Sequence, residues 1–279
     1  MISRALGVQA GRPVDAAPGG DVSTIEARGP LLVRATPRLL SAVREIALLS
    51  GVFVMYELGR HLVRNRAGLA FSDADSVVSL ERTLRLPSEK SVQHLLLSND
   101  SLIHAANVFY VSVHFPATVA FLVWMWAFRP RAYTWARSLL VSLTLVALLL
   151  HVTFPLAPPR MLSGQGFVDT MAVYGPSAYG GSTEGVTNQY AAMPSLHAAW
   201  AIAVAAVLIV VLKGRWRWLA ALHPILTVAV VVGTANHYWL DVAGAGALVL
   251  LAMLVHGFSP AVDGPVSAPC GRPARPSMR

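Results

Sequence analysis

The chain has 279 residues, of which 55% are hydrophobic and only 13% are charged; its formal net charge is +8 and its mean hydropathy is +0.55. A soluble domain carries about 25% charged residues, so this composition excludes an ordinary water-soluble protein with one core. The Lys and Arg residues stand in short links between apolar blocks, which favours membrane topology over nucleic-acid binding.

The apolar blocks are roughly 18 to 25 residues long, which is enough to cross a bilayer as a helix. We therefore predict an all-α integral membrane protein with six transmembrane helices in one bundle. One further amphipathic helix is expected on the membrane surface within residues 72–101, ending near Pro87. The six predicted spans cover approximately residues 46–63, 102–128, 138–154, 194–212, 218–234 and 238–258.

Composition also predicts that the chain is divided into three parts: an arm, a membrane domain and a tail. Residues 1–38 are rich in Gly, Pro, Ala and Arg and lack periodicity, as expected for a disordered cytoplasmic arm. Residues 39–258 form the six-helix membrane domain, which would carry the catalytic site. Residues 259–279 are polar and rich in Pro, and we expect a disordered cytoplasmic tail there.

The basic residues predict the orientation in the membrane. With six spans, the arm, the links at 129–137 and 213–217 and the tail all fall on one side, and each carries several Arg or Lys residues. The positive-inside rule makes that side cytoplasmic, so a multi-pass protein of the plasma membrane with both termini in the cytoplasm is expected. Basic residues between 60 and 90 oppose this orientation, although acidic neighbours accompany them.

This topology brings three polar motifs to the same extracytoplasmic boundary. Arg160 lies just after the end of span three, His197 lies near the start of span four, and His237 and Asp241 lie at the start of span six. If the last segment is helical, positions four apart share one face, so the carboxylate of Asp241 can reach the imidazole of His237.

Two His residues, a carboxylate and an Arg suit phosphoryl chemistry on a lipid headgroup. His237 is the candidate nucleophile, with Asp241 holding its tautomer, and His197 is the candidate general acid. Arg160 and the backbone near Ser195, at a helix start, are candidate phosphate ligands. A possible substrate pocket is lined by His151, Tyr190, Asn236 and Tyr238.

The motifs Pro-Leu-Ala-Pro-Pro-Arg (155–160), Ala-Met-Pro-Ser-Leu-His (192–197) and Asn-His-Tyr-Trp-Leu-Asp (236–241) together resemble those of the type 2 phosphatidic acid phosphatase superfamily. The resemblance covers roughly residues 45–258 and is strongest to the branch of inositol phosphorylceramide synthase and its bacterial relatives. It implies a metal-independent reaction without a cofactor, through a phosphohistidine at His237.

Three departures from the commoner superfamily pattern bear on the reaction. The first motif lacks the usual Lys before its Arg, Leu196 replaces the usual Gly, and Val230-Val231 stand in place of Ser-Arg. Two cationic phosphate ligands are thus missing, which favours the transferase-like branch over simple monoester hydrolysis.

We therefore expect transfer of a phospho-headgroup, of the phosphoinositol type, from a phospholipid to a lipid or glycan alcohol. The alternative is a phosphatase of phosphatidate or a polyprenyl phosphate, and a second alternative is a non-catalytic anion or proton transporter. A metal pair of His237 and Asp241 lacks a third ligand at helical spacing. The expected partners are the bilayer and its lipid substrates, with no nucleic acid; the oligomeric state and the roles of His104 and His114 stay open.

Overall fold

A computed structural model of the chain describes residues 31–63, 66–177 and 189–260. The chain divides into two compact units, Met1–Ala47 and Leu48–Arg279, and the contacts discussed below lie within the second. Residues 1–30 of the predicted arm and 261–279 of the predicted tail lie outside the described residues. The first helix begins at Leu31, inside the predicted arm, so the helical chain starts earlier than its composition indicated.

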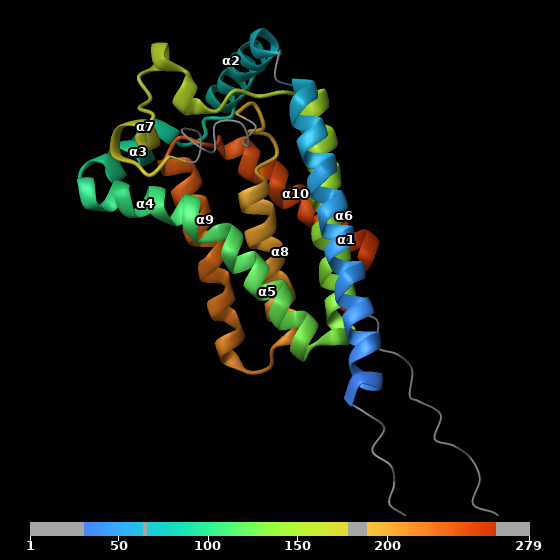
Figure 1. The fold of residues 1–279 in the computed structure, drawn as a ribbon. Coiled ribbons are helices and arrows are strands. Elements are labelled where there is room, and N and C mark those ends of the chain that lie inside the picture. Colours follow the sequence, from blue (N-terminus) through green and yellow to red (C-terminus); the bar gives the residue numbers. More distant parts are fainter. Residues whose placement is uncertain (1–30, 64–65, 178–188, 261–279) are drawn as a thin grey trace, which may run out of the picture. The chain divides into compact units, whose positions relative to one another are not determined.

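The described residues fold into helices joined by short links, with one isolated parallel β-bridge between Leu156 and Ala191 (Figure 1). The all-α class predicted from the sequence is confirmed. The helices are α1 Leu31–Val63, α2 Ala67–Thr83, α3 Glu89–Leu97, α4 Asp100–Ser112, α5 His114–Phe128, α6 Pro130–Thr153, α7 Thr170–Tyr174, α8 Leu196–Val211, α9 Leu222–Gly233 and α10 Trp239–His256, with 3-10 turns η1 Pro159–Met161, η2 Ser163–Gln165 and η4 Arg215–Ala221.

Among the described residues, four segments are long and apolar enough to cross a membrane: Leu39–Gly59, Pro130–Thr153, Arg215–Gly233 and Trp239–His256. The pair α4 and α5 makes a fifth candidate, bent by 43° at the break between them. Helix α8 is apolar but shorter. Each of the six predicted spans thus coincides with helical chain, while length and composition support four or five spans, and the sixth remains a prediction.

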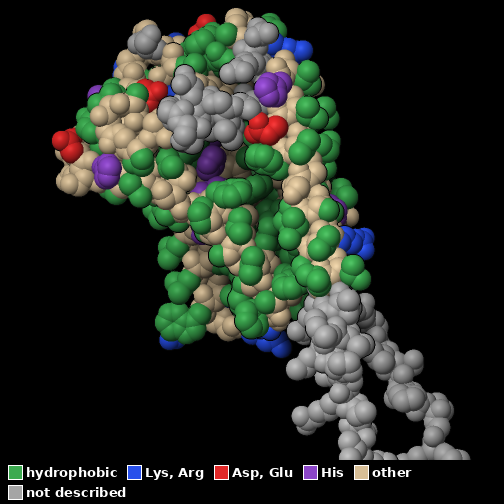
Figure 2. Space-filling model, in the orientation of Figure 1, with side chains coloured by type: hydrophobic (Ala, Val, Ile, Leu, Met, Phe, Trp, Pro, Cys, Tyr) green, Lys and Arg blue, Asp and Glu red, His purple; other side chains and the backbone are tan. Residues whose placement is uncertain are grey.

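Helices α5, α6, α8 and α10 surround one hydrophobic core. Small side chains on α8 allow its neighbours to approach closely, which is the usual way in which membrane helices pack without a hydrophobic driving force. In Figure 2, hydrophobic side chains cover the part of the visible face below the level of α3 and α4, and Asp and Glu side chains appear around α2, α3 and α4. The Ala residues that α8 buries are Ala198, Ala199, Ala201, Ala203 and Ala205.

The predicted amphipathic helix that ends near Pro87 corresponds to α2, and a second helix that was not predicted, α3, follows Pro87. Helix α2 ends at Thr83, before Pro87, and the chain turns through Arg85, whose φ is 54°, before α3 begins at Glu89. Pro87 cannot continue the hydrogen-bond pattern of a helix, and this explains the break. The buried face of α2 packs onto the chain around Leu156, Ala192 and Tyr238. The residues of that face follow helical spacing: Ala70, Ala74, Val77 and Glu81.

Candidate active site

His237 lies in the short link between α9 and α10, two residues before Trp239, the first residue of the helix that carries Asp241. Its backbone N–H donates to the Val231 carbonyl at 3.1 Å, and the preceding turn passes through Ala235, whose φ is 53°. The side chain is almost fully buried. The link is therefore anchored to the end of α9, and the position of His237 does not depend on a helical conformation.

The contact between His237 and Asp241 exists, but its geometry differs from the helical one predicted. Trp239 is the first helical residue, so Asp241 occupies the third position of α10, and its Oδ2 accepts the backbone N–H of Tyr238 at 2.8 Å. This is the acidic half of a helix cap, in which a carboxylate folds back over the start of its own helix. The same Oδ2 lies 3.3 Å from Nδ1 of His237.

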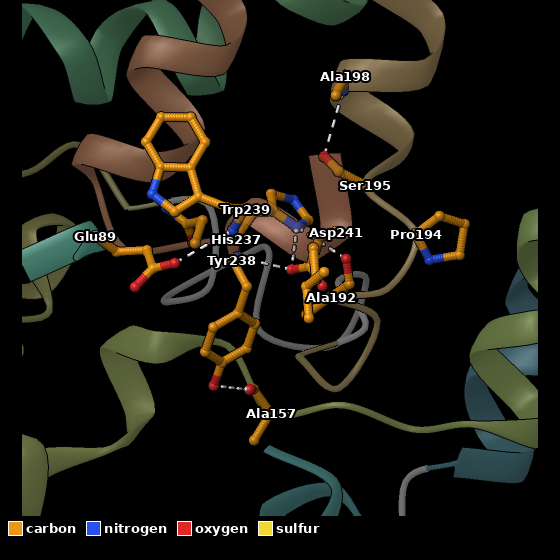
Figure 3. Close-up of polar contacts among 12 residues, drawn as sticks. Glu89, Ala157, Ala192, Pro194, Ser195, Ala198, His237, Tyr238, Trp239 and Asp241 are labelled. Atoms are coloured by element: carbon orange, nitrogen blue, oxygen red, sulfur yellow. Dashed lines mark hydrogen bonds and ion pairs between the residues drawn. The ribbon is translucent and has the colours of Figure 1, made fainter. Parts of the chain in front are cut away.

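The shortest contact of the His237 ring is with a backbone carbonyl. Nδ1 lies 2.9 Å from the oxygen of Ala192, in the motif that precedes α8 (Figure 3). A carbonyl oxygen only accepts hydrogen bonds, so Nδ1 must carry the proton, and Nε2 of the neutral ring then presents its lone pair. We therefore assign the Nδ1–H tautomer, held jointly by Ala192 and Asp241.

Burial lowers the pKa of His237 from 6.5 to about 4, the Ala192 carbonyl opposes this shift, and the positive charge of Arg160 adds to it. At neutral pH the imidazole is thus uncharged, which is the form that a nucleophile requires.

His197 faces His237 from the first turn of α8. The two ring centroids are 6.1 Å apart, and the planes are inclined by 55°. On its other sides His197 stacks on Tyr110 of α4, with ring centroids 4.3 Å apart, and lies against the tilted ring of His114 of α5, at 4.6 Å. Because α4 and α5 are bent at the break between them, both rings reach the same imidazole. His114, whose role the sequence left open, is therefore a neighbour of the predicted general acid.

Arg160 is buried beside the link that holds His237. Its Nε donates to Asn236 Oδ1 at 3.0 Å, its backbone N–H donates to the Ala235 carbonyl at 2.8 Å, and an NH1 group pairs with Asp169 at 2.9 Å. The guanidinium therefore lies next to the candidate nucleophile, as the order of the motifs predicted. Asp169, which sequence reasoning missed, adds the anionic partner of this cation.

Asp169 belongs to the segment between α6 and α8, which contains the short helices η1, η2 and α7. Gln93 of α3 holds this segment by two hydrogen bonds with the backbone of Val168, at 2.8 and 3.0 Å. Asn107 of α4 donates to the carbonyls of Thr170 and Gly175. These bonds set the position of Asp169, and no sequence pattern close to Asp169 indicates them.

Ser195 caps α8 with its hydroxyl, which accepts the N–H of Ala198 at 3.3 Å. Its own N–H donates to the carbonyl of Asp241 at 3.2 Å. The residue thus ties the second motif to the third. Any phosphate contact from the backbone here falls to the N–H groups of Leu196 and His197, because those of Ser195 and Ala198 are engaged.

The four residues expected to line a pocket have distinct places. His151 is buried near the end of α6, where its Nε2 bonds to the Pro194 carbonyl at 3.0 Å and supports the second motif. Asn236 orients Arg160 and also donates to Thr234 Oγ1 at 2.8 Å. Tyr190 packs edge-on against Phe71, with ring centroids 6.4 Å apart.

Tyr238 corrects the expectation of a pocket-lining residue. Its ring is 0% exposed in the cluster beneath α2, and its hydroxyl donates to the Ala157 carbonyl at 2.9 Å (Figure 3). Burial, together with the nearby carboxylates of Asp241, Glu81 and Glu89, raises its pKa. Tyr238 is therefore a packing residue that joins the first and third motifs.

Two further residues that sequence reasoning missed are Glu81 and Glu89, both buried at the start of α10. Glu81 accepts the N–H of Leu240 at 2.8 Å and Glu89 accepts the N–H of Trp239 at 3.3 Å. In the sequence they appear as ordinary charges of an amphipathic segment. Within the described residues, no group of three or more His, Cys, Asp or Glu side chains is arranged to hold a metal ion.

The apolar helices and a buried site of His, Asp and Arg define a helical membrane protein with a polar centre suited to phosphate chemistry. The family model of the PAP2 superfamily matches residues 75–255. The chain therefore belongs to the PAP2 superfamily, which confirms the superfamily suggested by the three motifs. Membership indicates a lipid phosphatase or phosphotransferase type of function. No curated protein and no solved structure matches the chain.

Proposed function

We propose that the protein is a membrane-embedded lipid phosphotransferase that moves a phospho-headgroup from a phospholipid to a lipid or glycan alcohol. The observation that carries the proposal is the tautomer of His237. Its Nδ1–H is held by the Ala192 carbonyl and Asp241, which leaves Nε2 as the nucleophilic atom, with His197 and Arg160 beside it.

In the first half-reaction, Nε2 of His237 attacks the phosphorus, and the bond from phosphorus to the leaving alkoxide breaks. His197, in its protonated form, gives the alkoxide its proton, and the first product is the dephosphorylated lipid alcohol. Arg160 and the N–H groups of Leu196 and His197 stabilise the phosphoryl oxygens in the transition state, where such donors contribute most. Asp241 stabilises the positive ring that forms when His237 becomes phosphorylated.

In the second half-reaction, the acceptor hydroxyl attacks the phosphohistidine and passes its proton to neutral His197. Nε2 of His237 leaves with its electron pair, so both histidines return to their starting forms. Water in place of the alcohol gives the phosphatase, which is the second candidate function and uses the same steps.

The departures from the commoner superfamily pattern favour the transferase. Val230 and Val231 are buried against the start of α10, in a position where the usual pattern has a cation, and Arg160 is already paired with Asp169. The loss of a cation from a site costs a doubly charged monoester more electrostatic stabilisation than it costs a singly charged diester. The substrate class we propose is therefore a phosphodiester lipid, with phosphoinositol as the leading headgroup.

We further propose that the site faces the extracytoplasmic side of the plasma membrane, with both termini in the cytoplasm and α8 as the sixth span. The basic links between the spans support this orientation. The reaction we propose needs no metal and no cofactor.

The decisive assay uses the full chain in detergent with labelled phosphatidylinositol, phosphatidate and polyprenyl phosphates, with and without acceptor alcohols, in EDTA. The expected result is a new labelled lipid that depends on the acceptor and is lost in His237→Ala and His197→Ala. Exposed His94 supplies the matched control, since His94→Ala should retain turnover.

Free phosphate released equally well without an acceptor would instead establish the phosphatase. Retained turnover in both histidine variants would refute the mechanism. An acid-labile label on wild-type protein that is absent from His237→Ala would support the phosphohistidine directly.

A further inference from the structure

Three successive backbone N–H groups at the start of α10 are each held by a carboxylate. Asp241 accepts from Tyr238, Glu89 from Trp239 and Glu81 from Leu240. The first N–H groups of a helix lack partners within the helix, so each needs an acceptor from elsewhere. Here one acceptor comes from α10 itself, one from α3 and one from α2 (Figure 3 shows Asp241 and Glu89).

The two glutamates are buried, with 6% and 7% of their surface exposed. Carboxylates are rarely buried to this extent unless they are paired, because burial penalises the charged form. Their partners are backbone donors of the helix that follows His237. The start of that helix is also electropositive, which favours one negative charge there.

Three fully ionised carboxylates in one buried turn would repel one another strongly. The side chains of Glu81 and Glu89 are hydrogen-bonded to each other, which requires a proton between them. Burial and this hydrogen bond raise the pKa of Glu81 to about 8, with further contributions from the negative charges of Glu89 and Asp241. Glu81 therefore holds its proton at neutral pH.

We propose that Glu81 and Glu89 are positioning residues that act as a single proton-sharing cap on α10 and thereby hold His237 and Asp241 in their reactive geometry. The path is short: the capped N–H groups belong to Trp239 and Leu240, which lie between His237 and Asp241 in the chain. The hydrogen bonds from the pair to α10 go to backbone N–H groups, so the pair would act through the position of α10 and not on the reacting phosphate. Its effect on turnover rests on the proposed function, whereas its effect on the helix does not.

Because Glu81 holds a proton, the strength of the cap depends on pH, and the direction of this dependence follows from the pKa of Glu81. The pKa of Glu81 is higher in the folded protein than the ordinary value of 4.5, so the folded state binds more protons between pH 4.5 and about 8. The cap is strongest below that window and weakens as pH rises toward 8. The other titratable and charged groups around the pair are Asp241, Tyr238 and Asp75.

The test compares Glu81→Gln with Glu81→Ala in the full chain. Gln keeps a neutral acceptor for Leu240 and a donor for Glu89, so Glu81→Gln should retain turnover within about threefold at pH 7. Turnover of the wild type should decline as pH approaches 8, whereas turnover of Glu81→Gln should not. Ala removes both groups, so kcat should fall about 10- to 100-fold, as expected for a small misplacement of reacting groups, with KM nearly unchanged. Exposed Asp100 is the control, and Asp100→Asn should keep the wild-type profile.

Hydrogen exchange at the amides of residues 238–240, followed by mass spectrometry, tests the cap without an assay of activity. Amide protection, corrected for the intrinsic exchange rate at each pH, should fall in wild type as pH rises toward 8, persist in Glu81→Gln and be lost in Glu81→Ala. If these changes appear but no lipid is turned over, the cap stands and the proposed function fails. The proposal would be overturned by amide exchange in Glu81→Ala that equals wild type, or by an alkaline loss of protection in Glu81→Gln that equals wild type. If Glu81→Ala does not fold, the comparison of Glu81→Gln with wild type still decides.

Discussion

At the scale of single residues, the site depends on which hydrogen bonds each side chain makes. The spacing of His237 and Asp241 predicted their contact, and the contact is present. The sequence assigned it to a shared helix face, whereas His237 precedes the helix and Asp241 caps it. The prediction reached the right pair because a residue before a helix and the third residue within it also meet through the cap.

The tautomer of His237 illustrates what sequence spacing leaves out. Its closest partner is the carbonyl of Ala192, which is 45 positions away in the chain. A backbone carbonyl is the same in every residue type, so no motif identifies it. The tertiary fold decides that Nδ1 is protonated and that Nε2 carries the free lone pair.

Because the His237 imidazole is buried, we expect turnover to persist to an unusually low pH. Because burial lowers the pKa of His237 to about 4, the neutral ring persists well below 6.5, and turnover should fall only as pH approaches 4. Folding stability follows the same sign: the unfolded state binds more protons between pH 4 and 6.5, so stability falls as pH drops through that window. A profile of kcat/KM against pH checks this, and a limb near 6.5 would contradict it.

We expect the conservative substitutions Arg160→Lys and Asp169→Asn to reduce kcat/KM by different amounts. Arg160 donates to Asn236 and Asp169 at once, and the planar fork of a guanidinium allows this while a phosphate is bound. Arg160→Lys should therefore reduce kcat/KM about 100-fold or more. Asp169→Asn keeps an oxygen acceptor, and we expect a loss of less than about tenfold. Equal losses in the two variants would show that the charge of Asp169 matters as much as the guanidinium.

At the scale of elements, the structure places helices where the sequence predicted them but gives some of them other neighbours. One helix ending near Pro87 was expected on the membrane surface within residues 72–101, and this stretch contains α2 and also α3, which bury Glu81 and Glu89 against α10. Their amphipathic pattern is compatible with either a bilayer or a protein surface. The pattern reports a buried face, and only the fold determines what buries it.

Contact between α3 and α9 leads to a prediction at Gly233, the last residue of α9. A Cβ atom at this position would overlap the side chain of Leu96 on α3. Gly233→Ala should lower the free energy of unfolding by about 1–3 kcal/mol, the usual cost of overpacking, and should disturb the His237 link that follows. Thermal unfolding in detergent measures the loss.

Two variants make that experiment specific. Gly246 in α10 has open space around its Cβ position, so Gly246→Ala should be neutral or slightly stabilising. Removing the Leu96 side chain should relieve the overlap, so Gly233→Ala should cost less in the presence of Leu96→Ala than alone. Equal costs in both backgrounds would refute the steric explanation.

At the scale of the whole molecule, composition and apolar blocks predicted a helical membrane protein, and the all-α class and several apolar helices agree with that prediction. Six spans remain a proposal, because α8 is shorter than the four candidate spans and α4 and α5 are bent relative to each other. Motif order predicted one site, and the structure brings Arg160, His197 and His237 together from three separate parts of the chain.

Orientation can be tested with the cysteine that the chain already has. Cys270 lies in the tail, and Gly164 is exposed with open space around it in the segment before α8. With Cys270 replaced by Ser, Gly164→Cys should react with a membrane-impermeant maleimide on intact cells, whereas Cys270 of the wild type should react only after permeabilisation. The opposite pattern would reverse the proposed topology.

The sequence by itself determined the helical class of the protein, its superfamily and the set of candidate reactive side chains, because apolar blocks and local motifs consist of residue types at short spacings. The tertiary structure decided how those side chains are held: Ala192 on His237, Asp169 on Arg160, and the glutamates of α2 and α3 on α10. The physical reason is that these partners are backbone groups or ordinary charges distant in the chain. Their role comes from the burial and the hydrogen bonds that packing imposes, and neither is encoded within one segment.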